Sequence, residues 1–300
     1  MKTLTPSKDS KAFSNTFMAS KSKLLHAIFQ FFFMSKNDNT KTHYTYFGRS
    51  KLKVLFYYLW YLLKKKYRND FINKNLLKEL ADEKFIFFPL QTEPERSLLL
   101  AAPFQTDQLG IIKNIAKSLP IDYKLYVKEH PTQLVRDWRK TSFYKQIMKL
   151  ANVKLIHPLV SSEQIIKKCS TVITIGGTAG FEAAFYGKPT ISFIKNGYSR
   201  LKSVITINNV EELPDTIRRT LRLKVDPDDV SKFVADLEKN SFEFPMSELD
   251  IAATTSFFYG GFLVDSIVEI SQVKSYFDKY EKEFYILASE HIKKIKQYKT

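Results

Sequence analysis

The feature that most constrains this sequence is an alternation of short β-branched or aromatic runs with helical patterns between Lys84 and Val225. The expected strands are 85–90, 123–131, 153–158, 171–175, 189–194 and 203–207, and the expected helices are 107–119, 143–151, 161–169, 181–187 and 210–222. Strands and helices that alternate in this way form βαβ units around a parallel sheet. Because parallel crossovers are right-handed, we expect an α/β fold, a doubly wound Rossmann-like sheet of five or six strands with helices on both faces.

The segments on either side of this region have a different character. Residues 1–83 are basic and aromatic without a clear strand pattern, and we interpret them as a remnant of an N-terminal domain or a linker from one. Residues 84–225 are the predicted Rossmann-like domain. Residues 226–300 are predicted to be C-terminal helices, at 227–240 and 275–299.

Composition narrows the class of partner. The chain has 47 Lys and Arg against 31 Asp and Glu, a net charge of +16, which fits nucleic acid, anionic lipid headgroups or phosphorylated small molecules. No RRM, KH or zinc-finger signature accompanies the charge, so we expect no nucleic-acid partner. The single cysteine, Cys169, excludes a disulfide framework and a cysteine-rich zinc site. No histidine pair has HxH or HExxH spacing, and we expect neither a metal nor a cofactor.

One basic and aromatic segment lies near the N-terminus. Residues 51–68, KLKVLFYYLWYLLKKKYR, place an apolar stretch between two groups of basic residues. The stretch is too short to span a bilayer. It predicts either an interfacial segment on anionic headgroups or a helix packed on the core. The apolar run 24–33 lacks a small-residue cleavage site, so we expect a cytoplasmic protein that contacts the inner membrane surface through residues 51–68.

Polar residues follow four consecutive predicted strands at the point where each strand ends. They are residues 91–96, residues 128–131, His157 with Ser161 and Ser162, and residues 176–182. Ligands of open parallel sheets bind at the carboxyl ends of the strands. The topology therefore predicts that these groups share one edge and form the binding site.

At this edge, the glycine-rich turn after the fourth strand has the strongest sequence support for ligand binding. Four of the nine glycines lie between Gly176 and Gly187. Gly176 and Gly177 allow backbone N–H groups to approach a ligand closely. Thr178 can cap the following helix at the end that favours a phosphate, and Glu182 can accept hydrogen bonds from ribose or sugar hydroxyls. The sequence GGTAGFE matches neither GxGxxG nor a P-loop, and a structural tight turn is the alternative.

Two histidines follow strands of the predicted sheet. His130 is fixed by Pro131 and can donate to a phosphate oxygen or act as a general acid, with Lys128 and Arg136 as nearby cations. A hydrogen bond that closes the strand end is the alternative for His130. For His157 this structural role is favoured, because no charged neighbour flanks it directly.

Three of these segments together resemble a known family. PLQTEPERSLLL (89–100), VKEHP (127–131) and VITIGGTAGFEAAFYGKPTISF (172–193) resemble the capsular polysaccharide biosynthesis proteins, bacterial Kdo-transferase-like glycosyltransferases with a GT-B fold. That family carries a Pro-Glu motif after the first strand of its C-terminal half, then a His-Pro motif, then a glycine-rich strand-turn-helix that ends in GKP. The resemblance covers about residues 84–207. One departure is visible, because the family has Gln before Pro-Glu where this chain has Glu93.

The resemblance implies a glycosyltransferase that moves a Kdo-like sugar from a CMP-sugar donor to a capsular or surface polysaccharide or a glycolipid acceptor. It implies two catalytic residues, Glu95 facing the reacting sugar and His130. The donor-binding residues that it implies are Lys128, His130, Pro131, Ser161, Ser162, Gly176, Gly177, Thr178 and Glu182.

A GT-B enzyme has two Rossmann-like domains, and only about 83 residues precede the matching half of this chain. We therefore expect donor binding to be retained and transferase activity to need more than this chain. Two alternatives stay open. One is an enzyme similar to CDP-glycerol glycerophosphotransferases, and the other is a non-catalytic binding subunit of a split polysaccharide-synthesis enzyme.

Overall fold

The computed structural model describes residues 25–26, 28–29, 31–32, 48–93, 96–131, 133, 139–258 and 268–298. The described chain divides into two compact units. The described part of the sheet unit is Leu63–Lys239, and the second unit combines Lys11–Leu62 with Asn240–Thr300.

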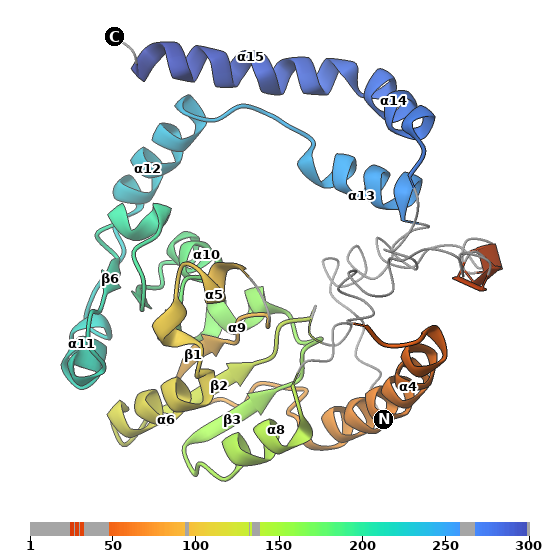
Figure 1. The fold of residues 1–300 in the computed structure, drawn as a ribbon. Coiled ribbons are helices and arrows are strands. Elements are labelled where there is room, and N and C mark those ends of the chain that lie inside the picture. Colours follow the sequence, from red (N-terminus) through yellow and green to blue (C-terminus); the bar gives the residue numbers. More distant parts are fainter. Residues whose placement is uncertain are drawn as a thin grey trace. The chain divides into compact units, whose positions relative to one another are not determined.

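The sheet unit is built on one sheet of six parallel strands (Figure 1). The strands are β1 (Phe85–Pro89), β2 (Lys124–Lys128), β3 (Val153–Ile156), β4 (Thr171–Thr174), β5 (Thr190–Ser192) and β6 (Val204–Thr206). Their order is β3-β2-β1-β4-β5-β6. The chain therefore adds β2 and β3 in turn on one side of β1, and then adds β4, β5 and β6 in turn on its other side. The switch point lies between β1 and β4. The prediction of a doubly wound, Rossmann-like α/β fold is confirmed.

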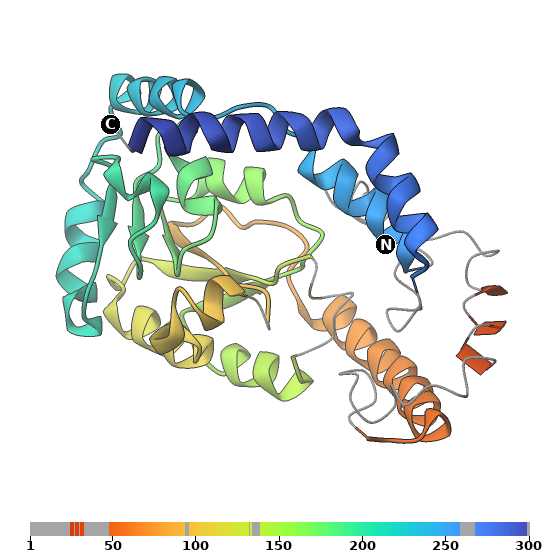
Figure 2. The same cartoon turned by 45° about the horizontal axis from the view of Figure 1, so that its top comes forward.

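Helices cover both faces of this sheet, as Figure 2 shows. The helices of the unit are α5 (Arg96–Leu99), α6 (Gln108–Ser118), α8 (Thr141–Met148), α9 (Ser162–Lys168), α10 (Ala179–Phe185), α11 (Leu213–Thr220) and α12 (Pro227–Lys239). Successive residues of a strand point to opposite faces. Ile86 and Phe88 therefore pack in a core with α6, α8 and α11, whereas Phe85 and Phe87 pack in a second core with α9 and α10. Burial on both faces explains why the strand sequences are continuously apolar.

The segment predicted to be interfacial or packed on the core is the start of a long helix, α4 (Lys51–Asn75). Its C-terminal end joins the core, where Ile72 and the following Leu76 are buried. Leu77 then pairs with the edge of β3, with its N–H 2.9 Å from the carbonyl of Leu155. Among the described residues, no helix is long and apolar enough to cross a membrane.

The chain beyond residue 240 differs in part from the prediction. It contains α13 (Met246–Phe257), α14 (Ile270–Lys279) and α15 (Glu281–Tyr298), so the single helix expected at 275–299 is divided at Tyr280 and α13 was not predicted. The break lets Tyr276 and Phe277 of α14 both contact Phe284 of α15, with ring centroids 6.1 and 4.8 Å apart. Helical propensity alone does not place such a break, because it is set by this aromatic contact.

Candidate functional site

The loops that follow β1 and β4 meet at the switch point of the sheet. Thr174, the last residue of β4, accepts hydrogen bonds at Oγ1 from the backbone N–H of Gly177 (3.0 Å) and the side-chain amide of Gln91 (3.3 Å). A Cβ atom on Gly177 would lie 2.8 Å from Nε2 of Gln91. Gly177 therefore lets the two loops approach each other at the position where open α/β sheets bind ligands.

Packing also explains two neighbouring glycines. A Cβ atom on Gly176 would lie 2.6 Å from Cδ1 of Ile194, and one on Gly180 would lie 2.7 Å from the hydroxyl oxygen of Tyr198. Tyr198 donates a hydrogen bond to the carbonyl of Gly177 (2.6 Å), and burial raises the pKa of Tyr198 to about 12, so that it stays protonated. The tight turn that was the structural alternative is present, and it lies at the predicted binding edge.

Thr178 does not cap helix α10 as the sequence predicted. Its φ of −61° and ψ of −23° are helical values, whereas a capping residue is usually extended. Its hydroxyl instead donates to Oε1 of Glu182, one turn along the helix, at 2.9 Å. Both side chains are exposed, so this pair presents a hydroxyl and a carboxylate to solvent beside the turn.

The end of β2 places a cation at the same edge of the sheet. Lys128 is buried, and its ammonium group donates a hydrogen bond to Oγ of Ser162 at 2.7 Å. Ser161 caps α9 by accepting the backbone N–H of Gln164 at 3.5 Å. The structure thus gathers a buried cation and two partly exposed hydroxyls where β2 meets α9.

The residues after Lys128 alternate between the two faces of the sheet. In an extended chain Lys128 and His130 share the α9 face, and Glu129 points to the α8 face. Glu129 is 1% exposed, whereas His130 is exposed. The backbone N–H of His130 donates to Oε1 of Glu129 at 2.8 Å. Together with the following Pro131, this hydrogen bond fixes the backbone that carries the His130 ring.

Glu129 is the centre of a buried polar network. Arg139 forms an ion pair with Glu129, and Tyr144 of α8 donates its hydroxyl to Oε2 of Glu129 at 2.7 Å. Arg139 also contacts the carboxylate of Glu93 at 3.1 Å and the backbone carbonyl of Gln91. Burial disfavours the charge of Arg139, but Glu129 and Glu93 outweigh this effect and raise its pKa. Burial and the charge of Glu129 raise the pKa of Tyr144, which remains a donor.

Two glutamines complete this network. Gln108 accepts the backbone N–H of Gln91 at 2.8 Å and donates to the carboxylate of Glu93. Gln133 accepts the backbone N–H of Glu93 at 3.2 Å. The loop after β1 is thereby tied to the loop after β2, and Glu93 has a structural role in place of the glutamine of the family motif.

His157 has the structural role that its sequence context favoured. Its Nε2 lies 2.9 Å from Oδ1 of Asn73 in α4, and its Nδ1 accepts the backbone N–H of Leu159 at 3.2 Å. Burial, with the nearby charges of Lys78 and Lys128, lowers the pKa of His157 to about 4. The neutral ring therefore joins the end of α4 to the end of β3.

Glu95 and Arg136 lie outside the described residues. Of the buried network, the sequence analysis placed Gln91, Glu93 and Glu129 in the loops at this edge, and it missed Gln108, Gln133, Arg139 and Tyr144. The one signal for Glu129 was its place between Lys128 and His130, where alternation turns it inward.

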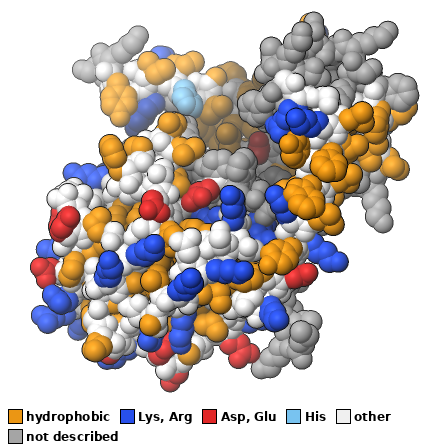
Figure 3. Space-filling view, turned by 60° about the horizontal axis from the view of Figure 1, so that its bottom comes forward, with side chains coloured by type: hydrophobic (Ala, Val, Ile, Leu, Met, Phe, Trp, Pro, Cys, Tyr) orange, Lys and Arg blue, Asp and Glu red, His pale blue; other side chains and the backbone are white. Residues whose placement is uncertain are grey.

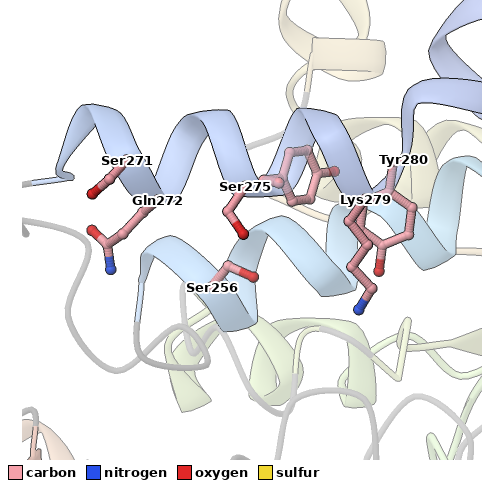
Figure 4. A pocket seen from close by; sticks show the side chains of 7 residues that line it. Ser256, Ser271, Gln272, Ser275, Lys279 and Tyr280 are labelled. Atoms are coloured by element: carbon pink, nitrogen blue, oxygen red, sulfur yellow. The ribbon is translucent and has the colours of Figure 1, made fainter.

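A separate hollow lies in the second unit between α13 and α14 (Figure 4). It has a volume of about 350 Å³ and is lined by Ser256, Ser271, Gln272, Ser275, Tyr276, Lys279 and Tyr280. No predicted site residue lines it. Among the residues that the structure describes, no group of His, Cys, Asp or Glu side chains could hold a metal ion.

The motifs at the sheet edge belong to a recognisable family. The family model of capsule polysaccharide biosynthesis proteins matches residues 2–201, which include every strand but the last. The chain belongs to this family. No curated protein sequence matches this capsule biosynthesis protein.

Solved structures similar to this capsule biosynthesis protein include nucleotide-sugar enzymes. UDP-GlcNAc 2-epimerase of Methanocaldococcus jannaschii, in complex with UDP-GlcNAc and UDP, is 13% identical, with a TM-score of 0.37 over 74% of this chain and 54% of that chain. KpsC of Thermosulfurimonas dismutans, described as a beta Kdo 2,4 transferase, is 17% identical, with a TM-score of 0.36 over 46% of this chain and 43% of that chain. This chain therefore spans about half the length of these structures, and similarities at this level carry no functional argument.

Proposed function

We propose that this protein is a glycosyltransferase that binds a nucleotide-activated sugar at the carboxyl edge of the sheet. It transfers the sugar to a capsular or surface polysaccharide or a glycolipid acceptor. The observation that carries the proposal is the grouping of Lys128, Ser162 and His130 at the edge that also holds the glycine turn of the switch point. Cations and N–H or O–H donors are the groups that bind phosphate oxygens. Membership of the capsule biosynthesis family supports the sugar chemistry.

The proposed donor is a CMP-activated, Kdo-like sugar. In the transfer, the bond between the anomeric carbon and the phosphate oxygen breaks, the acceptor hydroxyl oxygen bonds to that carbon, and the hydroxyl proton leaves. Lys128 and His130 would stabilise the negative charge that develops on the departing phosphate. Pro131 would fix His130, and Ser161 and Glu182 would contact hydroxyl groups of the donor.

The remaining roles at this edge follow the family resemblance. Gly176, Gly177 and Thr178 would contact the donor through the turn after β4, and Glu95 would face the reacting sugar. We place the reaction on the cytoplasmic side of the inner membrane.

The same edge also fits two other ligands or roles. The cytidine diphosphate of CDP-glycerol would occupy the same cation and hydroxyl groups, in a glycerophosphotransferase. The second is a donor-binding subunit without its own transferase activity, in which the same edge would bind the donor.

The experiment that tests the proposal is a calorimetric titration of the chain with CMP, CDP and UMP. We expect saturable binding of CMP that weakens at least tenfold, about 1.4 kcal/mol, in His130→Ala and in Lys128→Met. His291→Ala is the matched control, because it removes an exposed histidine from α15 and should leave the affinity unchanged.

The outcomes separate the alternatives. Tighter binding of CDP than of CMP would favour the glycerophosphotransferase. CMP binding without sugar transfer would favour the donor-binding subunit. No binding of any nucleotide by a cooperatively folded sample would overturn the proposal.

A further inference from the structure

The N-terminal two thirds of α4 carry an exposed apolar stripe that runs along one side of the helix. The stripe consists of Leu52, Phe56, Leu59, Trp60, Leu63 and Tyr67, each between 51% and 74% exposed. At 100° per residue these six positions fall within an arc of about 100°, so they lie on one face of the helix. From Leu52 to Tyr67 the stripe is about 22 Å long, at 1.5 Å per residue.

Basic residues border this stripe on both sides. At 100° per residue, Lys53 and Lys64 lie along one border and Lys66 lies along the other, and all three are exposed. No acidic residue occurs between residues 48 and 69, and the first one is Asp70. Figure 3 shows exposed hydrophobic side chains beside lysine and arginine side chains on the side of the view where α4 lies.

The side of α4 away from the stripe and the C-terminal end of α4 are buried or in contact with the rest of the sheet unit. Arg68, on the side opposite the stripe, is 3% exposed. Ile72 lies in the core of the sheet unit, and Asn73 contacts His157 of the strand end at 2.9 Å. The C-terminal part of α4, which carries the last residues of the stripe, therefore belongs to the folded sheet unit.

We propose that α4 binds the surface of an anionic lipid bilayer, with its stripe in the headgroup region and its lysines on lipid phosphates. An apolar face with tyrosine and tryptophan and with lysine on its borders is typical of interfacial helices, and the lysines complement anionic lipids in charge. The helix lies flat, since its apolar stretch is too short to cross the hydrocarbon core.

The test is flotation of the full chain with vesicles. One set contains equal amounts of phosphatidylglycerol and phosphatidylcholine, and the other contains phosphatidylcholine alone. We expect binding to the anionic vesicles that weakens as salt is added. The double variant Phe56→Gln and Leu63→Gln should lower the vesicle affinity roughly tenfold or more, because it removes apolar side chains from the stripe.

Matched variants distinguish the effect of the stripe and its bordering lysines from a general effect of exposed aromatic residues or of net charge. Tyr57→Gln with Tyr58→Gln removes two exposed aromatic residues of the same helix outside the stripe and should leave most of the affinity. Lys64→Gln with Lys66→Gln should lower the affinity for anionic vesicles roughly tenfold. Lys113→Gln with Lys117→Gln removes the same charge from exposed positions of α6 and should have little effect.

Vesicle binding by α4 does not depend on the nucleotide site at the sheet edge. A failure of membrane binding can therefore be distinguished from a failure of nucleotide binding. A folded wild-type chain that binds neither kind of vesicle would overturn it, and so would a stripe variant that binds as well as the wild type. CMP titration of the stripe variant serves as the internal reference, because α4 contributes no residue to the proposed donor site.

Discussion

At the end of β2, one step of alternation separates a residue of the proposed donor site from a structural one. Lys128 and His130 lie on the α9 side, where polar groups at the sheet edge can contact a ligand. Glu129, between them, is buried against Arg139 and Tyr144. A buried ion pair adds little net stability, but loss of one partner leaves an uncompensated charge and is costly. Glu129 therefore acts on His130 indirectly, as a positioning residue that holds its backbone.

The change Glu129→Gln tests this role. The glutamine keeps one acceptor oxygen and carries an NH2 group in place of the other, so it can accept from only one of Tyr144 and His130. It also leaves the charge of Arg139 without its closest partner. We expect the free energy of unfolding in urea to fall by about 3 kcal/mol. Glu163→Gln, which breaks the exposed pair with Lys167, should lower it by less than about 1 kcal/mol. Equal effects of the two changes would contradict the structural role of Glu129.

Some residues at this edge could be predicted from the sequence, and others could not. Lys128 and His130 could be predicted as edge residues because they directly follow a clear strand, and strand ends meet in a parallel sheet. The partners of Glu129 could not be predicted. Arg139 and Tyr144 are 10 and 15 residues away in the chain, and no local pattern pairs them with a carboxylate. The same limit applies to Gly177, whose need for a small side chain comes from Gln91 in another loop.

At the scale of elements, α4 and β3 are joined through a neutral histidine. The ring of His157 connects Asn73 of α4 to the turn after β3, and burial is the main reason that its pKa is lowered to about 4. In the unfolded chain its pKa is near 6.5. Between these two values the unfolded state binds more protons than the folded state, so acidification favours unfolding.

The resulting prediction concerns stability against pH. The contribution of neutral His157 is fully present above about pH 6.5 and is lost as the pH falls toward about 4, by up to about 3 kcal/mol. His157→Gln should therefore flatten the pH dependence of the free energy of unfolding in this window. The exposed His291→Gln should not change it. If both variants keep the wild-type slope, His157 does not titrate as the structure indicates.

The elements themselves were predictable to different degrees. The strands of the sheet were visible because burial on both faces requires short, continuously apolar runs such as Phe85–Pro89. The helices of the second unit were less visible. The division at Tyr280 and the helix α13 (Met246–Phe257) are accompanied by aromatic contacts between helices, which no single-helix pattern reports.

At the scale of the whole molecule, burial is distributed unequally. The two cores on either side of the sheet, with a third cluster around Val204 and Phe233 in the same unit, contain nearly all of the buried apolar side chains that the structure describes. Among the described residues of the second unit, Leu249 of α13 is the only buried hydrophobic residue, and α14 and α15 contribute none. Because hydrophobic burial is the main stabilising contribution in folding, the sheet unit should account for most of the stability of the chain.

Amide hydrogen exchange followed by mass spectrometry measures this difference. Segments with few buried contacts open locally at low cost, so amides of α15 should exchange roughly a hundredfold faster than those of β1, whose residues 85–88 are no more than 1% exposed. Addition of CMP should slow exchange at residues 128–131 and 176–182 and leave α13, α14 and α15 unchanged. Protection of α15 equal to that of β1 would show that the second unit gains stability from contacts other than its own buried side chains. Protection by CMP confined to α13–α15 would place the nucleotide away from the edge of the sheet.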